Sequence, residues 1–266
     1  MMRQQQKMMW IAVLALVLGV VAACRPAPTP APAGPIEVKE FANLQLLVST
    51  EWLAEHVKDA DLRLVDARQA EDYAPGHMPS AVSIPRPITF DPDALKGMIG
   101  QPVQMAQLFG SKGINEKVHA VIYAQGKGTA ASRVLWTLEY YGHPNVSLLD
   151  VGFTKWQAGG REVTTEEPEV TSVEFSLEVH SWLLTTKEEI VGKLDQEGLV
   201  FLDARSGEEY KGRDVRTKRG GHIPGAVNVD WRENFTPGEV PVFKSPAELE
   251  ELYADVGVTR HKEVHA

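Results

Sequence analysis

The sequence predicts an α/β protein made of two copies of one parallel-sheet domain, the second incomplete at its carboxyl end. Two internal repeats carry this prediction. The segment Leu62–Arg68 reads Leu-Arg-Leu-Val-Asp-Ala-Arg and recurs as Leu-Val-Phe-Leu-Asp-Ala-Arg at Leu199–Arg205. Downstream, Gly-His-Met-Pro-Ser-Ala-Val at Gly76–Val82 recurs as Gly-His-Ile-Pro-Gly-Ala-Val at Gly221–Val227. An apolar run ending in a polar turn is typical of a buried strand, and a repeated order of parts indicates duplication.

The first copy continues through two more strands and a helix. The apolar run Ala120–Tyr123 leads into a glycine-containing loop and then a helical run, Ala130–Tyr141. A second apolar run, Val146–Leu149, precedes a closing segment through Trp156 and Gly160. Strands that alternate with helices predict a parallel sheet covered on both faces.

A third repeat fixes how far the second copy extends. In the first copy Leu108, Gly113 and Ile114 precede the strand at Ala120, and the same spacing recurs, 144 residues later, as Leu252, Gly257, Val258 and Val264. The second copy therefore ends as its central strand begins. We divide the chain into a signal peptide (1–23), a proline-rich tether (24–40), domain 1 (41–160), a linker rich in Glu and Thr (161–173) and an incomplete domain 2 (174–266).

The amino terminus has the layout of a secretory signal. Arg3 and Lys7 precede 16 mostly apolar residues, Met8–Ala23, and Cys24 follows. A membrane-spanning helix needs about 20 apolar residues, which makes a span the weaker interpretation. Val21-Ala22-Ala23-Cys24 resembles a bacterial lipobox, in which the cysteine is acylated; an ordinary signal peptide with a chance cysteine is the alternative. We expect a bacterial cell-envelope protein, lipid-anchored at Cys24 and extracytoplasmic.

Charge and cysteine content exclude several classes of function. The formal net charge is −9, and residues 1–23 contain no acid, so the remainder is more acidic still. An acidic body argues against nucleic acid as a partner. Cys24 is the only cysteine of the chain, so no intrachain disulfide can form and lipidation would leave no free thiol.

Taken together, these motifs resemble the tandem rhodanese family, which includes thiosulfate and 3-mercaptopyruvate sulfurtransferases. The resemblance covers Phe41–Ala266. It rests on the two Asp-Ala-Arg strand ends, on the two Gly-His motifs with Tyr73 ahead of the first, and on the closing residues Leu149, Asp150, Gly152, Phe153 and Trp156. It implies two rhodanese-like domains and a ping-pong transfer of sulfur from a small sulfur-containing anion to a thiol or cyanide acceptor, without a cofactor or a metal.

The resemblance also implies where a nucleophile should lie. In active members the central strand of the second domain ends in a cysteine whose thiolate is surrounded by loop amides. In the first copy this position is Ala124, followed by a degenerate substrate-binding loop of Gln125, Gly126, Lys127, Gly128 and Thr129. This is typical of a non-catalytic first domain. In the second copy the same position would be 268, beyond Ala266, so we expect no catalytic residue and a truncated product or a fragment.

Several other polar residues have simpler interpretations. Active relatives commonly carry a basic residue at the position of Glu209, and the neighbouring Arg213, Arg216, Lys218 and Arg219 could restore positive charge or be a solvated loop. We interpret His77 and His222 as structural, and each Asp-Ala-Arg arginine as paired with its aspartate. On a strand, His261 and His265 would lie roughly 13 Å apart, too far for one metal ion.

We therefore expect a sulfurtransferase-family lipoprotein that is inactive in this chain. Two alternatives stay open. One is a non-catalytic module at the membrane surface, whose amide-lined loop binds an anion or a partner protein. The other is a decayed gene product, in which the incomplete second sheet is unstable because it exposes an unpaired strand edge. The oligomeric state is left open.

Overall fold

The structure is a computed structural model that describes residues 45–95 and 97–266. The predicted signal peptide, the tether, Cys24 and the first residues of domain 1 lie outside these ranges. Within the described part of the chain, no helix combines the length and the apolar character that crossing a membrane requires.

The first domain is built on a five-stranded sheet in which every pair of neighbouring strands is parallel. The strand order is β1-β5-β4-β2-β3, with β4 in the centre. The bounds are β1 (Leu47–Val48), β2 (Leu62–Asp66), β3 (Val82–Ser83), β4 (His119–Tyr123) and β5 (Val146–Leu149). The predicted α/β class and the parallel sheet are thus confirmed.

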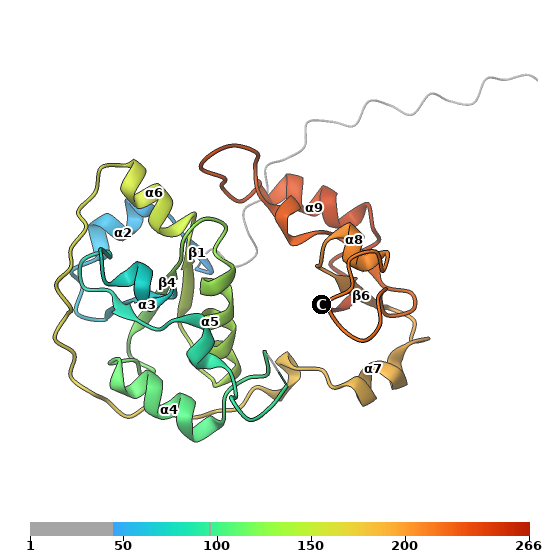
Figure 1. Cartoon of the computed structure of the whole chain (residues 1–266), viewed down its shortest axis with the longest axis horizontal. Helices are drawn as coiled ribbons and strands as arrows, with labels where there is room; N and C mark the ends of the chain where they lie inside the picture. Colours follow the sequence, from blue (N-terminus) through green and yellow to red (C-terminus); the bar gives the residue numbers. More distant parts are fainter. Residues whose placement is uncertain (1–44, 96) are drawn as a thin grey trace, which may run out of the picture. The chain divides into compact units, whose positions relative to one another are not determined.

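Helices cover both faces of this sheet, because the central strand is apolar on both sides. Ala120 and Ile122 point to one face and Val121 and Tyr123 to the other, and all four are fully buried. The first face packs against α4 (Pro102–Ser111) and α5 (Thr129–Tyr140), the second against α2 (Thr50–His56) and α6 (Gly152–Ala158), as Figure 1 shows. The short helices α3 (Ala70–Tyr73) and η1 (Arg86–Thr89) follow β2 and β3.

The segment that follows α6 packs on the first domain along its length, beyond the predicted linker. The backbone of Thr164 forms an isolated antiparallel bridge with His77. The amide of Val173 donates to the carbonyl of Gly110, and Phe175 is buried against Phe109, with 5.2 Å between ring centroids. Residues 161–180 therefore form a strap on the first domain, and the predicted boundary at 173/174 falls inside it.

The second domain repeats the start of the same fold. Its sheet has the order β7-β6-β8, with β6 (Leu199–Asp203), β7 (Val227–Asn228) and β8 (Glu263–His265) all parallel. Its helices are η2 (Ser181–Leu183), α7 (Lys187–Lys193), α8 (Gly207–Tyr210), η3 (Trp231–Asn234) and α9 (Pro246–Ala254). Strand order and direction match β3, β2 and β4 of the first domain.

The two sheets differ in how well they are covered. Val65 on β2 is fully buried, whereas Leu202, at the same place on β6, is only half-buried. In the first domain, the far edge of β4 pairs with β5. Among the described residues no strand pairs with the far edge of β8, so that edge carries free backbone donors and acceptors.

We expect the strap to contribute to the stability of the first domain. Replacing Phe175 by alanine should lower the free energy of unfolding by about 3–5 kcal/mol, because it leaves a cavity against Phe109. Leu177→Ala is the matched control: the side chain is exposed on the same strap, and its loss should cost about 0.5 kcal/mol or less. Urea unfolding measures both; equal, small effects would show that the strap is peripheral.

Candidate functional site

An aspartate–arginine pair closes the end of β2 in the first domain. Asp66 is fully buried and accepts hydrogen bonds from the backbone amide of Arg68 at 2.9 Å and from its Nε and Nη2 atoms at 3.0 and 2.6 Å. Nη2 also donates to the carbonyl of Gly76, and the guanidinium lies 3.7 Å from the ring centre of Phe153. With these donors engaged inside the fold, Arg68 holds the turn in place.

The second domain repeats this pair with much more exposure. Arg205 donates to Asp203 from its amide, Nε and Nη2 atoms at 2.9, 3.0 and 2.5 Å, and Nη2 also reaches the carbonyl of Gly221. The hydrogen bond from Arg205 lowers the pKa of Asp203 below its usual value. The Arg205 side chain is 48% exposed, against 5% for Arg68. The same local sequence thus forms the same local contacts without the surrounding core.

Both Gly-His motifs are structural. The Nδ1 atom of His77 lies 3.1 Å from the carbonyl oxygen of Tyr73, and its Nε2 atom lies 3.1 Å from the carbonyl oxygen of Glu166 on the strap. His222 repeats the first contact, to Tyr210, at 2.8 Å. Each imidazole stacks on its tyrosine ring. These contacts fit the structural role predicted from the sequence, and in His77 they engage both ring nitrogens.

The loop after β4 keeps its turn but not an open amide cradle. Ala124 is buried in the larger apolar core, where a thiol would be disfavoured as a thiolate. The amide of Gly126 and the side chain of Gln125 both donate to the Thr154 hydroxyl, at 3.1 and 3.0 Å. A Cβ atom on Gly152 would lie 2.2 Å from the carbonyl oxygen of Ala124, so α6 closes tightly on this loop.

Part of the predicted loop stays available to a ligand. Gly126 and Gly128 adopt positive φ angles of 60° and 72°, which turn the chain into α5. Among the described residues, the backbone amides of Lys127 and Thr129 have no protein acceptor. Of the five residues predicted to bind a substrate, Gln125 and Gly126 are therefore already hydrogen-bonded to Thr154.

Strand pairing places the equivalent of Ala124 in the second domain. Leu62 on β2 lies opposite His119 on β4, and Leu199 on β6 lies opposite Glu263 on β8. The pairing register is therefore shared by the two domains, and the offset of 144 residues holds in three dimensions. The position that corresponds to Ala124 is 268, two residues after Ala266.

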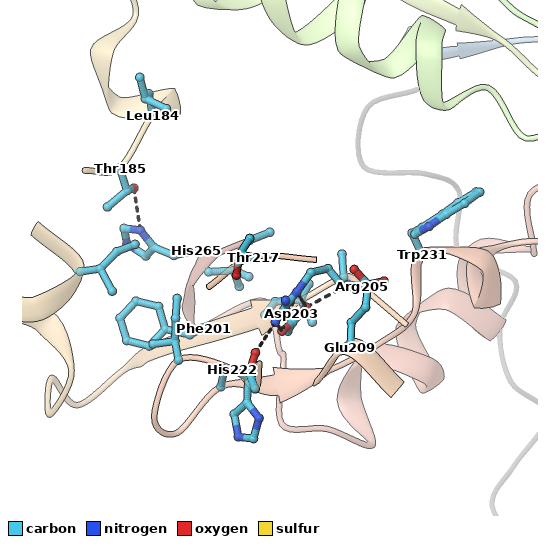
Figure 2. Close-up of a pocket in the computed structure, with 18 of the residues that line it drawn as sticks. Leu184, Thr185, Phe201, Asp203, Arg205, Glu209, Thr217, His222, Trp231 and His265 are labelled. Atoms are coloured by element: carbon cyan, nitrogen blue, oxygen red, sulfur yellow. Dashed lines mark hydrogen bonds and ion pairs between the residues drawn. The ribbon is translucent and has the colours of Figure 1, made fainter. Parts of the chain in front are cut away.

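An open cavity of about 1330 Å³ lies at this edge of the second sheet. Figure 2 shows Asp203, Arg205, Glu209, Trp231 and His265 around it. In the first domain, β5, α5 and α6 complete the corresponding sheet and cover it. The cavity therefore lies beside β8, the counterpart of the central strand β4, with Glu263, Val264 and His265 in its lining.

Glu209 at the cavity rim is both a helix cap and an ion-pair partner. Its carboxylate accepts from the Ser206 amide and hydroxyl, and its own amide donates back to Ser206, which completes a capping box at α8. Arg216 lies 3.2 Å from the same carboxylate. The Ser-x-x-Glu spacing could have revealed the cap in the sequence, but the fold was needed to find the ion pair.

The neighbouring basic residues are partly neutralised. Arg213 pairs with Glu208 at 3.3 Å, and Arg216 pairs with Asp214 as well as with Glu209. Among the described residues, no ion pair involves Lys218 or Arg219. The positive rim considered from the sequence is therefore reduced to these last two side chains.

The two late histidines do not form a shared site. His265 lies on β8, with Nδ1 2.8 Å from the Thr185 hydroxyl (Figure 2). Its Nε2 atom lies 2.6 Å from the Glu263 carboxylate. Lys193 donates to the same carboxylate at 2.8 Å, so this cluster ties β8 to α7. Across the described ranges, no group of three or more His, Cys, Asp and Glu side chains is arranged to hold a metal ion.

Comparison with known proteins agrees with the duplicated fold. A family model described as a rhodanese-like domain matches residues 49–159 and again 186–264. A thiosulfate sulfurtransferase of Azotobacter vinelandii is 31% identical over 236 residues, which cover 85% of this chain and 83% of that protein. The sulfur carrier protein TtuD of Thermus thermophilus is 30% identical, with 84% of this chain and 82% of that protein covered. The crystal structure of the 3-mercaptopyruvate sulfotransferase SseA from Escherichia coli is 28% identical with a TM-score of 0.74, covering 82% of this chain and 86% of that one.

The paired Asp-Ala-Arg motifs allow a direct test of their structural role. Arg68→Met should destabilise the first domain by about 3–5 kcal/mol, because it leaves the buried Asp66 carboxylate without its partner. Arg205→Met, the same change at a half-exposed copy, should cost about 1 kcal/mol or less. Hydrogen–deuterium exchange of β2 and β6 peptides reports each domain separately. Equal costs at the two positions would contradict the role of burial.

Proposed function

Because the chain belongs to the rhodanese-like domain family, we propose that its 266 residues are a sulfurtransferase scaffold whose transfer site belongs to the second domain and whose nucleophile is missing from these residues. The donor would be a small sulfur-containing anion and the acceptor a thiol or cyanide. The first domain is the non-catalytic partner of the pair.

One observation carries this proposal: the two domains share one strand register. If the nucleophile follows the central strand, as the family resemblance implies, this register supports Ala124 as its counterpart in the first domain and position 268 in the second. A methyl group cannot attack sulfur, and the sole cysteine of the 266 residues, Cys24, precedes both domains. Sulfur transfer in this class requires a thiolate that takes the outer sulfur of the donor as a persulfide and passes it on. These residues supply the strand and turn, without the thiolate.

The proposal predicts that residues 24–266 do not turn over. Purified protein with thiosulfate and cyanide should form thiocyanate no faster than a boiled control, because no thiolate is available at either site. The Azotobacter vinelandii relative serves as the positive control under the same conditions. Thiocyanate formation above the boiled sample would show that another group performs the transfer, and the proposal would then be wrong.

We further propose that Cys24 anchors the protein to a bacterial membrane outside the cytoplasm. The support is the order of residues at the amino terminus: Arg3 and Lys7, then an apolar run, then small residues directly before the cysteine. The five prolines between Cys24 and residue 36 favour an extended spacer between the membrane and the first domain.

A single substitution tests the anchor. Cys24→Ser should move the protein from the membrane fraction to the soluble extracytoplasmic fraction, because serine offers no thiol for acylation. The wild-type protein should also carry a lipid mass on its amino-terminal peptide. The anchor proposal is wrong if Cys24→Ser fractionates like the wild type and the wild-type amino-terminal peptide carries no lipid. The signal would then be an ordinary one, or residues 1–23 would stay attached.

A non-catalytic binding module is the second candidate, and the free amides of Lys127 and Thr129 favour it. Anion binding by the loop should disappear when Gly126 and Gly128 are both changed to valine, because β-branched residues tolerate their positive φ angles poorly. Binding that is unaffected by this change would place the anion elsewhere.

A further inference from the structure

Two arginines of the first domain lie close together without an acidic partner. Arg86 is on η1 and Arg133 on α5, and their guanidinium carbons lie 5.8 and 4.8 Å from the centre of the same Phe90 ring. Neither forms an ion pair with a carboxylate in the described part of the chain, whereas most arginines there do: Arg68, Arg161, Arg205, Arg213, Arg216, Arg232 and Arg260.

Arg133 is held in place but incompletely satisfied. Its Nε atom donates to the Thr89 hydroxyl at 3.4 Å, and its guanidinium also lies 4.9 Å from the ring centre of Trp136. Its Nη2 atom is shielded from solvent and has no hydrogen-bond partner among the described residues. A buried charged donor without an acceptor is costly, so native proteins usually supply one.

The fold keeps the two residues near each other. Thr89 links them, because its hydroxyl donates to the carbonyl of Arg86 at 2.7 Å while accepting from Arg133. Burial, and then the charge of Arg86, lower the pKa of Arg133. In an acidic chain, such a pair would more naturally be separated or matched with a carboxylate. An anion bound at the two guanidinium groups would balance this positive charge.

We infer that Arg86 and Arg133 form a binding site for a small oxyanion of the sulfate or phosphate type. Arginine presents N–H groups in a fork that matches two oxygens of one anion, and a tetrahedral oxyanion has enough oxygens for both side chains. The Arg86 side chain is exposed, so an anion can reach it from solvent. The site uses no atom of the loop Gln125–Thr129 and needs no thiol, so it is independent of sulfur transfer.

Titration calorimetry of the full chain with sodium sulfate, against sodium chloride at equal ionic strength, tests the site. Wild type should bind sulfate saturably. Arg86→Gln and Arg133→Gln should each weaken binding at least tenfold, because each removes charged donors. Arg63→Gln is the matched control: Arg63 is also a half-buried arginine that forms no ion pair within the described residues, but it donates to the carbonyl of Gly113. It should bind sulfate like wild type.

Two results would contradict a sulfate site at Arg86 and Arg133. Absence of saturable sulfate binding in wild type overturns it, as does binding that is unchanged in Arg86→Gln. Because Arg86 is exposed, this variant should fold even if Arg133→Gln does not, which circular dichroism checks. The Gly126→Val, Gly128→Val double variant should keep sulfate binding; loss there, with binding retained in Arg86→Gln, assigns the anion to the loop and also overturns the site.

Discussion

The parallel pairing between the Asp-Ala-Arg strand and the central strand determines most of this molecule. In both domains, it brings the first residues of the two strands opposite each other, Leu62 with His119 and Leu199 with Glu263. Since a one-residue slip would turn every side chain to the other face, the buried faces fix this register. It also sets which residues of the central strand lie beside the Asp-Ala-Arg strand in each domain.

Burial, more than sequence, separates the two copies. The Asp66–Arg68 pair is enclosed by Phe153 and the surrounding core, while Asp203 and Arg205 form nearly the same hydrogen bonds with the arginine half-exposed. A local motif can form through its own hydrogen bonds. Its contribution to stability depends on the layers packed over it, which in the first domain come from β5, α5, α6 and the strap.

Charge compensation distinguishes structural polar groups from candidate ligand groups. Glu209 stands where active relatives commonly carry a basic residue, but it caps α8 and pairs with Arg216. Its negative charge is therefore largely balanced within the fold. Arg86 and Arg133 are the opposite case, since Thr89 and Phe90 hold them together and no carboxylate matches them in the described ranges. Ion pairing within the described residues thus separates Glu209, whose charge is balanced, from Arg86 and Arg133, whose charges are not.

The sequence alone determined the duplication, the parallel α/β class and the offset of 144 residues, because apolar runs, Gly-His turns and strand-end motifs are local patterns. It also located Ala124, because that residue directly follows a recognisable strand. Tertiary structure decided the rest. The strap at 161–180 has no apolar period and is anchored by Phe175 and by backbone hydrogen bonds, so no sequence pattern predicted it. Thr154 engages Gly126 from a helix further along the chain, and Arg86 and Arg133, 47 residues apart, lie near the same Phe90 ring. Such contacts depend on how helices close over the sheet, which spacing along a chain does not encode.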